Sequence, residues 1–352
     1  MGEKFRIGLT RDFLDDKGNL AYKDIGLKLL YDNPHVEVEF LKEYQPVATA
    51  EQIRDYDAVI VLKPHFTKDT FEGVERLTAI GRFGVGYDSI DVQACTDANV
   101  ILFITPEGVK YSMAESVVTW LLMLSKRALI KDQLVRSERW DDRSDYMGTC
   151  LENRTLGLIG LGNIGREVVR LLAPFQMNIV TFDPYINEEQ TLAIGVKSVS
   201  FYVLLQESDF VSINCPLNDE TRGLIGEREL HLMKSSAYLI NTARGPIVNE
   251  RAIIKALQEN WIAGAALDVF EQEPINPDNP LLKLDNVILA PHAIGWTDEM
   301  FLGIGTWDCL GTLNVMRGEI PNSVVNRDVL DKQELQQKLQ SYREQFGNTG
   351  SA

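Results

Sequence analysis

The chain is poor in the residues that build disulfide frameworks and zinc sites. Its 352 residues include only four cysteines and four histidines. The cysteines stand far apart and form neither a CxxC pair nor a zinc-ligand spacing; they are Cys95, Cys150, Cys215 and Cys309. We therefore expect reduced thiols, no metal site and a cytoplasmic location.

Positive charge is also in deficit, and long apolar runs are missing. The chain has 35 lysines and arginines against 51 aspartates and glutamates, which gives a formal net charge of −16. Such an acidic surface argues against nucleic acid or anionic membranes as partners. No apolar stretch reaches the length of a membrane span, and the N-terminus lacks the apolar core of a signal peptide.

A glycine-rich turn between a predicted strand and a predicted helix is the most informative motif. The apolar run Leu156 to Ile159 leads into Gly160-x-Gly162-x-x-Gly165, and an amphipathic segment follows. A second apolar run, 178–182, ends on Asp183, which lies 183 − 162 = 21 positions after the middle glycine. Strand, turn, helix, strand and acid in this order are typical of a dinucleotide site. The adenosyl site of methyltransferases, which also uses a glycine-rich turn and an acid, is the alternative.

The glycines and the acid indicate how NAD would bind. The first glycine permits the turn, the second lets the pyrophosphate approach the backbone, and the third lets helix and strand pack closely. Free N–H groups at the helix start then face the phosphates. Asp183 favours NAD over NADP, because a 2′-phosphate would meet a like charge and residues 184–187 offer no Arg or Lys.

Apolar runs alternate with helical patterns along most of the chain, which predicts an α/β fold. Strands are expected at 5–9, 36–41, 58–62, 77–80, 100–104, 156–159, 178–182, 210–214, 237–241, 263–267 and 286–290. Helices are expected at 22–31, 49–54, 89–98, 113–126, 166–175, 226–233, 249–260 and 297–316. The segment 136–150 is expected to be irregular and exposed, and the tail beyond residue 330 to be an exposed helix with a frayed end.

The glycine-rich turn lies near the middle of the chain, so the cofactor domain is not the first domain. We expect two doubly wound parallel-sheet domains: a Rossmann cofactor domain at 108–296, inserted into a flavodoxin-like substrate domain. The substrate domain is then discontinuous and comprises 1–107 and 297–352.

Three ionisable residues follow predicted strands of the cofactor domain: Arg244, Glu273 and His292. Because strand ends of a doubly wound sheet open onto one crevice, they should converge near the nicotinamide. His suits proton donation to a developing alkoxide, a carboxylate orients it, and a guanidinium can grip a substrate carboxylate. Taken singly, each residue also fits a structural role: His292 in the fold, Arg244 as a helix cap and Glu273 in a surface pair.

The chain resembles the D-isomer-specific 2-hydroxyacid dehydrogenase family over nearly its whole length. The motifs that carry the resemblance are Gly84-Val-Gly86-Tyr-Asp88, the glycine-rich turn, Asn241-Thr-Ala-Arg244-Gly-Pro-Ile-Val, Leu267-Asp-Val-Phe, Glu273-Pro and Pro291-His292. The resemblance implies a catalytic trio of Arg244, Glu273 and His292. It also implies that the Val85 and Gly86 N–H groups hold the substrate carboxylate, and that the protein is a homodimer.

The resemblance also implies which residues surround NAD. Asp183 would bind the adenosine ribose, Cys215 and Pro216 would border the adenine, and Asp268 would lie near the nicotinamide amide. The further expected cofactor contacts are Asn163, Ile164, Thr221, Thr242 and Ala243.

The leading interpretation is an NAD-dependent enzyme that interconverts a small D-2-hydroxy acid and a 2-oxo acid. Glu273 argues against formate, because members that act on formate carry glutamine there. Trp296 resembles the arrangement in corepressors that share this fold; it would shape the substrate pocket or simply pack. An NADH-sensing, corepressor-like binding protein is therefore the alternative function.

The substrate's far end is expected to meet the first domain, chiefly at Lys63. The strand at 58–62 runs into Lys63-Pro-His65, and its end should point into the crevice. A single lysine offers a point charge rather than the forked contacts that suit a phosphate. We therefore expect a small anionic substrate, polar or carboxylate-bearing rather than phosphorylated. A surface lysine that starts a loop is the alternative, and Arg82 is a rival for the same role.

Overall fold

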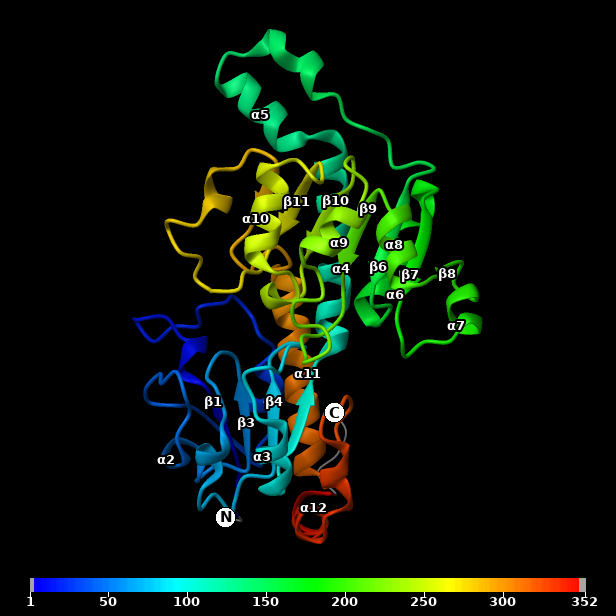
Figure 1. The fold of residues 1–352 in the computed structure, drawn as a ribbon. Coiled ribbons are helices and arrows are strands. Elements are labelled where there is room, and N and C mark those ends of the chain that lie inside the picture. The colour runs from blue at the N-terminus through cyan, green and yellow to red at the C-terminus, as the bar shows by residue number, and fades with distance from the viewer. Residues whose placement is uncertain (1–2, 348–352) are drawn as a thin grey trace. The chain divides into compact units, whose positions relative to one another are not determined.

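The computed structural model describes residues 3–347, and the chain divides into two compact units (Figure 1). The first unit comprises residues 1–109 and 296–352, and the second comprises 110–295. The first boundary falls inside helix α4 (Pro106–Lys126), and the chain re-enters the first unit just before helix α11 (Asp298–Met316). Of the helices in the described residues, none is both long enough and apolar enough to cross a membrane.

A five-stranded parallel sheet forms the centre of the first unit, in the order β2-β1-β3-β4-β5. Its strands are β1 (Phe5–Leu9), β2 (Val36–Phe40), β3 (Ala58–Val61), β4 (Ala79–Arg82) and β5 (Ile101–Ile104). This is the flavodoxin-like order. Strand β3 is buried at every residue, as expected for a sheet covered on both faces. Strand β4 lies two residues later than expected, because Gly81 and Arg82 pair with the end of β5.

Short helices and turns surround this sheet. They are α1 (Lys28–Tyr31), α2 (Ala50–Ile53), α3 (Val92–Asp97), α12 (Gln333–Phe346) and the 3₁₀ turns η1 (Arg11–Phe13), η2 (Lys68–Phe71) and η7 (Arg327–Asp331). The expected helix at 22–31 is wrong for its first six residues. Gly26 has a left-handed φ of +75°, and the Asp24 side chain accepts its N–H at 2.8 Å. A Cβ at Gly26 would lie 2.9 Å from the Thr306 nitrogen, so the turn lies directly against α11.

The C-terminal helix α12 is less exposed than expected. Its Leu335, Leu339 and Phe346 are buried, and the Tyr342 hydroxyl donates to Asp57 Oδ1 at 2.8 Å. Asp57 is itself buried and accepts two further bonds from Arg76, at 3.0 and 2.8 Å. The helix is therefore tied to the start of β3 by a charged network. The expected frayed end, 348–352, lies outside the described residues.

Seven parallel strands form the sheet of the second unit, in the order β12-β11-β10-β9-β6-β7-β8. They are β6 (Thr155–Ile159), β7 (Asn178–Phe182), β8 (Lys197–Ser198), β9 (Phe210–Ile213), β10 (Tyr238–Asn241), β11 (Gly264–Leu267) and β12 (Val287–Leu289). The order reverses at β6, between β7 and β9, which is the switch point where doubly wound sheets bind ligands. Sequence analysis missed β8, because its two residues carry no apolar run. The prediction of an α/β protein with two parallel sheets is confirmed.

Helices of the second unit include several that the sequence pattern did not predict. The unexpected ones are α5 (Ala128–Arg136), α7 (Glu188–Leu192) and α8 (Phe201–Glu207). The others are α4, α6 (Asn163–Leu172), α9 (Glu227–Leu232) and α10 (Glu250–Gln258), with 3₁₀ turns η3 (Trp140–Tyr146), η4 (Ala173–Phe175), η5 (Gly245–Ile247) and η6 (Pro280–Lys283). Helix α4 begins seven residues before the expected start, at Pro106, because proline fits the first position of a helix. The segment 136–150 is mostly exposed, as expected, but it contains η3.

Candidate active site

The three glycines of the turn after β6 occupy three different environments. Gly160 has a φ of +92°, and a Cβ there would lie 2.9 Å from the Cys215 nitrogen. A Cβ on Gly165 would lie 2.7 Å from the Gly160 carbonyl oxygen, so turn and helix leave no room for a side chain. At Gly162, by contrast, a Cβ would have no neighbour within 4 Å. Space is thus kept open at the middle glycine and closed at the other two.

Helix α6 begins at Asn163 directly after this open position. Its first intrahelical bond runs from the Arg166 N–H to the Gly162 carbonyl at 3.0 Å, which leaves the preceding N–H groups of the first turn without intrahelical acceptors. Together with the positive end of the helix dipole, these groups suit a phosphate. The turn therefore fits a dinucleotide: the open face at Gly162 would take the pyrophosphate, with Asn163 and Ile164 beside it.

Asp183 follows β7 and lies at the neighbouring strand end. Its Oδ2 accepts the Leu161 N–H at 2.8 Å, and its Oδ1 accepts the Tyr185 N–H at 2.9 Å. The carboxylate is therefore fixed against the glycine-rich turn. Each oxygen keeps a further lone pair, so a ribose hydroxyl can still donate to it.

The other expected cofactor residues lie at the ends of β9 and β10. Burial raises the pKa of the Cys215 thiol to about 11, so Cys215 is an uncharged wall residue at neutral pH. Thr221 donates its hydroxyl to the Pro216 carbonyl at 2.7 Å. After β10, the Asn241 side chain accepts the Ala243 N–H at 3.0 Å and so shapes the Thr242–Ala243 turn.

His292 and Glu273 form the most direct side-chain pair of the site. His292 Nδ1 and Glu273 Oε2 lie 2.7 Å apart, and both side chains are partly exposed, at 47% and 36%. The second carboxylate oxygen accepts the Phe270 N–H at 3.0 Å. Burial raises the pKa of Glu273, but its bonds to His292 and Phe270 and the charge of Arg244 outweigh that effect and lower the pKa below its ordinary value. The carboxylate is thus ionised, and Nδ1 of His292 is the donor.

Arg244 belongs to the same group of residues. It follows β10, it is half-buried, and its charge acts on Glu273. Its backbone carbonyl accepts the Asn241 amide at 3.0 Å, and its Nη1 donates to the Ala243 carbonyl at 2.8 Å. The structure therefore brings Arg244, Glu273 and His292 together at the ends of neighbouring strands.

Asp268 has a structural role that the sequence did not reveal. It is 2% exposed, and its Oδ1 accepts the N–H groups of Ala293 and Ile294 at 2.8 and 3.1 Å. Its carbonyl accepts the His292 N–H at 2.8 Å. Burial raises the pKa of Asp268, although the two N–H groups oppose that rise. These bonds fix the turn in which His292 adopts a left-handed φ of +53°. The only sequence signal was an aspartate directly after a buried strand.

The expected substrate residues Lys63, Val85, Gly86 and Trp296 all belong to the first unit. Lys63 is exposed after β3, whereas the Arg82 guanidinium bonds to the carbonyl of Phe83. Among the described residues, none accepts a hydrogen bond from the N–H groups of Val85 or Gly86. Trp296 is 50% exposed and packs edge-on against Tyr22 and Phe301, with centroids 5.8 and 5.2 Å away.

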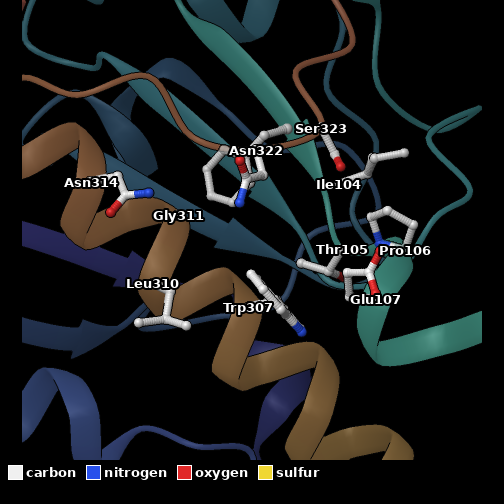
Figure 2. A pocket seen from close by; sticks show the side chains of 11 residues that line it. Ile104, Thr105, Pro106, Glu107, Trp307, Leu310, Gly311, Asn314, Asn322 and Ser323 are labelled. Atoms are coloured by element: carbon white, nitrogen blue, oxygen red, sulfur yellow. The ribbon is translucent and has the colours of Figure 1, made fainter.

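A small hollow in the first unit is separate from these residues. Figure 2 shows Trp307 and Asn314 reaching into it from α11, with Thr105, Pro106 and Glu107 at the start of α4. Its volume of about 30 Å³ admits one water molecule but no metabolite. Within residues 3–347, moreover, no three His, Cys, Asp or Glu side chains are grouped so as to hold a metal ion.

Comparison with known proteins agrees with this geometry. Residues 118–293 match the D-isomer specific 2-hydroxyacid dehydrogenase, NAD binding domain. A glyoxylate reductase of Korarchaeum cryptofilum is 38% identical over 84% of this chain and 91% of its own length. A D-3-phosphoglycerate dehydrogenase of Methanocaldococcus jannaschii is 37% identical over 92% of this chain but 64% of its own length.

The solved structures that resemble the chain include D-lactate dehydrogenase from Aquifex aeolicus, complexed with NAD and lactic acid. It matches with a TM-score of 0.77 and 26% identity, over 91% of this chain and 99% of that protein. The fold and the relatives together define an NAD(P)-dependent oxidoreductase. The chain belongs to the D-isomer specific 2-hydroxyacid dehydrogenase family. The corepressor-like alternative is therefore set aside in favour of an enzyme.

The glycine-rich turn provides a test that separates binding from folding. Gly162→Val should leave the melting temperature nearly unchanged, because its Cβ meets no neighbour, but should weaken NADH binding ~10-fold or more by blocking the pyrophosphate. Gly165→Ala should instead lower the free energy of unfolding by roughly 1–3 kcal/mol, because its Cβ would press on the Gly160 carbonyl. Fluorescence titration with NADH and thermal melts measure the two effects. Normal NADH binding by Gly162→Val would contradict the assignment.

Proposed function

We propose that the protein reduces a small 2-oxo acid to a D-2-hydroxy acid with NADH, and that the second unit binds the cofactor while the first selects the substrate. The nicotinamide, when bound, supplies the hydride to the carbonyl carbon. His292 donates the proton that the carbonyl oxygen then needs. The observation that supports this role is the 2.7 Å bond between His292 Nδ1 and Glu273. It occupies Nδ1 and leaves Nε2 as the nitrogen available to the substrate.

Glu273 and Arg244 have complementary roles in this proposal. The Glu273 carboxylate accepts the Nδ1–H of His292 and fixes the orientation of the imidazole ring. Arg244 supplies a guanidinium, which grips the substrate carboxylate and polarises the adjacent carbonyl. The position of Arg244 supports that role. Its charge lies close enough to Glu273 to lower the pKa of that carboxyl, so the guanidinium is near the pair that includes the proton donor. The reverse reaction uses the same residues, with His292 as the base.

The substrate carboxylate also needs donors, and we assign these to the loop after β4. The N–H groups of Val85 and Gly86 have no acceptor among the described residues, so both remain available for an anion. Gly84 is held from both sides by Thr105: its N–H donates to the Thr105 hydroxyl at 3.0 Å, and its carbonyl accepts the Thr105 N–H at 3.0 Å. A fixed loop with two free donors suits a carboxylate. The half-exposed Trp296 is our choice for the wall beside the substrate's tail.

His292→Ala should keep NADH affinity within about twofold and lower kcat by ~100- to 10,000-fold, the usual loss on removing a general acid. His231→Ala is the matched control, because His231 lies in the same unit but stacks on Trp261 instead. Glu273→Gln should lower kcat with less effect on KM, since an amide can turn either its oxygen or its NH2 group towards Nδ1 and no longer fixes the ring. Near-normal kcat in either variant would contradict these roles.

We further propose a preference for NAD(H) over NADP(H). The Asp183 carboxylate is fixed at the strand end by two N–H groups, so it meets the ribose hydroxyls without reorganisation. A 2′-phosphate would meet this negative charge. The ratio of kcat/KM for NADH over NADPH should exceed ~100 and fall at least ~10-fold in Asp183→Ser. Asp219→Asn, an exposed residue of the same unit, is the control for net charge. Equal kcat/KM with both cofactors would refute the preference.

Lys63 is our proposal for the residue that meets the substrate's tail. Its exposure after β3 and its single charge favour a polar or carboxylate-bearing 2-oxo acid over a phosphorylated one. Lys63→Ala should lower kcat/KM several-fold for substrates with such a tail and leave glyoxylate unaffected. The exposed Lys68, on η2, provides the matched control, and Arg82→Ala tests the rival residue. Unchanged kinetics for Lys63→Ala across a panel of 2-oxo acids would remove Lys63 from the site.

The protein's assembly and location complete the proposal. We propose a homodimer formed through the second unit, where the segment after α4 exposes Trp140 at 62% and Met147 at 75%. Large apolar groups on a surface favour a protein partner. The free cysteines, including the exposed Cys150, support a reducing, cytoplasmic location. Sedimentation equilibrium tests the dimer, and cell fractionation tests the location.

A further inference from the structure

Two loops on either side of the glycine-rich turn are joined by a pair of exposed side chains. The Tyr185 hydroxyl donates to Glu220 Oε2 at 3.2 Å. Tyr185 follows β7 and Glu220 follows β9, and both strands pair with β6, one on each side of it. Neighbouring strands lie about 5 Å apart, so these two strands are about 10 Å apart. The Tyr185–Glu220 pair therefore spans the switch point of the sheet, where doubly wound folds bind their ligands.

Each member of this pair is held by its own loop. The Tyr185 N–H donates to Oδ1 of Asp183, the carboxylate that we expect to bind the adenosine ribose, at 2.9 Å. On the other side, the Asn218 side chain accepts the N–H groups of Glu220 and Thr221 at 3.0 and 2.9 Å. The hydroxyl–carboxylate bond thus connects two ordered turns.

The ring of Tyr185 is exposed although it stands next to the crevice. Its exposed fraction is 79%, which is more than that of Trp140 or Met147. Cys215, which follows β9 at the same edge of the sheet, is by contrast half-buried. A ring packed into the crevice would be covered by the residues beneath it. The ring of Tyr185 therefore lies over the crevice rather than in it, and its faces remain available to a flat ligand.

Adenine is the part of a dinucleotide that suits this place. The base is attached to the ribose assigned to Asp183, and Tyr185 is two positions further along the chain. An aromatic ring is a favourable surface for a base, because the two π-systems stack. The hydrogen bond to Glu220 raises the pKa of Tyr185, so the hydroxyl stays protonated at neutral pH and continues to donate.

We propose that Tyr185 and Glu220 form a strap over the adenine of the bound cofactor, in which the ring covers the base and Glu220 holds the ring in place. The inference rests on the cofactor site proposed above and adds two residues to it. Tyr185 is the contact residue, and Glu220 is a positioning residue that acts through it. Because affinity differences between related complexes arise mostly in dissociation, the strap slows the release of the cofactor.

The binding of ADP-ribose, measured by calorimetry, tests the strap directly, because this fragment carries the adenine but takes no part in hydride transfer. Tyr185→Ala should weaken the binding of ADP-ribose and of NADH by the same factor, about 10-fold, since the stacking surface is gone. Binding of reduced nicotinamide mononucleotide, which lacks the adenine, should not change. Tyr202→Ala is the matched control, because Tyr202 is an exposed tyrosine of the same unit, on α8.

Variants of the hydrogen bond separate positioning from contact. Tyr185→Phe and Glu220→Ala keep the ring but lose its anchor, so each should weaken ADP-ribose binding about 2- to 3-fold, as expected for an exposed pair. Glu220→Gln should restore the affinity, because an amide oxygen accepts the same hydroxyl. If Glu220 acts through Tyr185, Glu220→Ala should have no further effect in a Tyr185→Ala background. Stopped-flow displacement of NADH should show the loss in the rate of release.

Three outcomes would overturn the proposal. Tighter binding of ADP-ribose by Tyr185→Ala would mean that the ring occupies the place of the base. Equal effects in Tyr185→Ala and Tyr202→Ala would mean that the ring has no special position, and additive losses in the double variant would mean that Glu220 does not act through Tyr185. If the wild-type enzyme reduced no 2-oxo acid, the proposed function would fail, whereas ADP-ribose binding would still decide this inference.

Discussion

The parallel direction of the strands is the constraint on which the site of the second unit depends. Parallel strands place all their carboxyl ends on one edge of the sheet, so residues far apart in sequence meet there. Strands β6 and β7 supply the glycine-rich turn and Asp183. Strands β10, β11 and β12 are followed by Arg244, by Asp268 and Glu273, and by His292. At that edge, Asp268 fixes the last of these turns. Its side chain accepts the N–H groups of Ala293 and Ile294, and its backbone carbonyl accepts the N–H of His292.

Sequence analysis predicted the features that depend on local pattern. Segments rich in apolar residues predicted eleven of the strands. Most of these segments are continuous runs, which a sheet covered on both faces selects, whereas β2 alternates between valine and glutamate. The glycine spacing predicted the contrast between a crowded Gly165 and an open Gly162, because backbone approach distances follow from the turn itself. The grouping of Arg244, Glu273 and His292 followed from their positions after strands.

Features that depend on long-range contacts were out of reach. The α12 helix was expected to be exposed because its sequence is polar, yet Tyr342 bonds to Asp57 across 285 residues. Residues 22–27 have helical composition, but Gly26 turns to fit α11. The burial of Asp308 gave no signal at all, because one acid in the apolar helix α11 does not reveal that Gly81, on strand β4, leaves room for it.

The tie between α12 and Asp57 has a consequence for synthesis. Ribosomes release the chain from its N-terminus, and domains fold as units once their residues have emerged. The second unit is continuous, so it can finish folding while α11 and α12 are still unmade. The strands of the first sheet, by contrast, are synthesised before the last helices that pack with them. Until α12 is made, Asp57 lacks its hydrogen bond from the Tyr342 hydroxyl. The sheet that is translated first is therefore the one that is completed last, when α12 and its Tyr342 hydroxyl have been made.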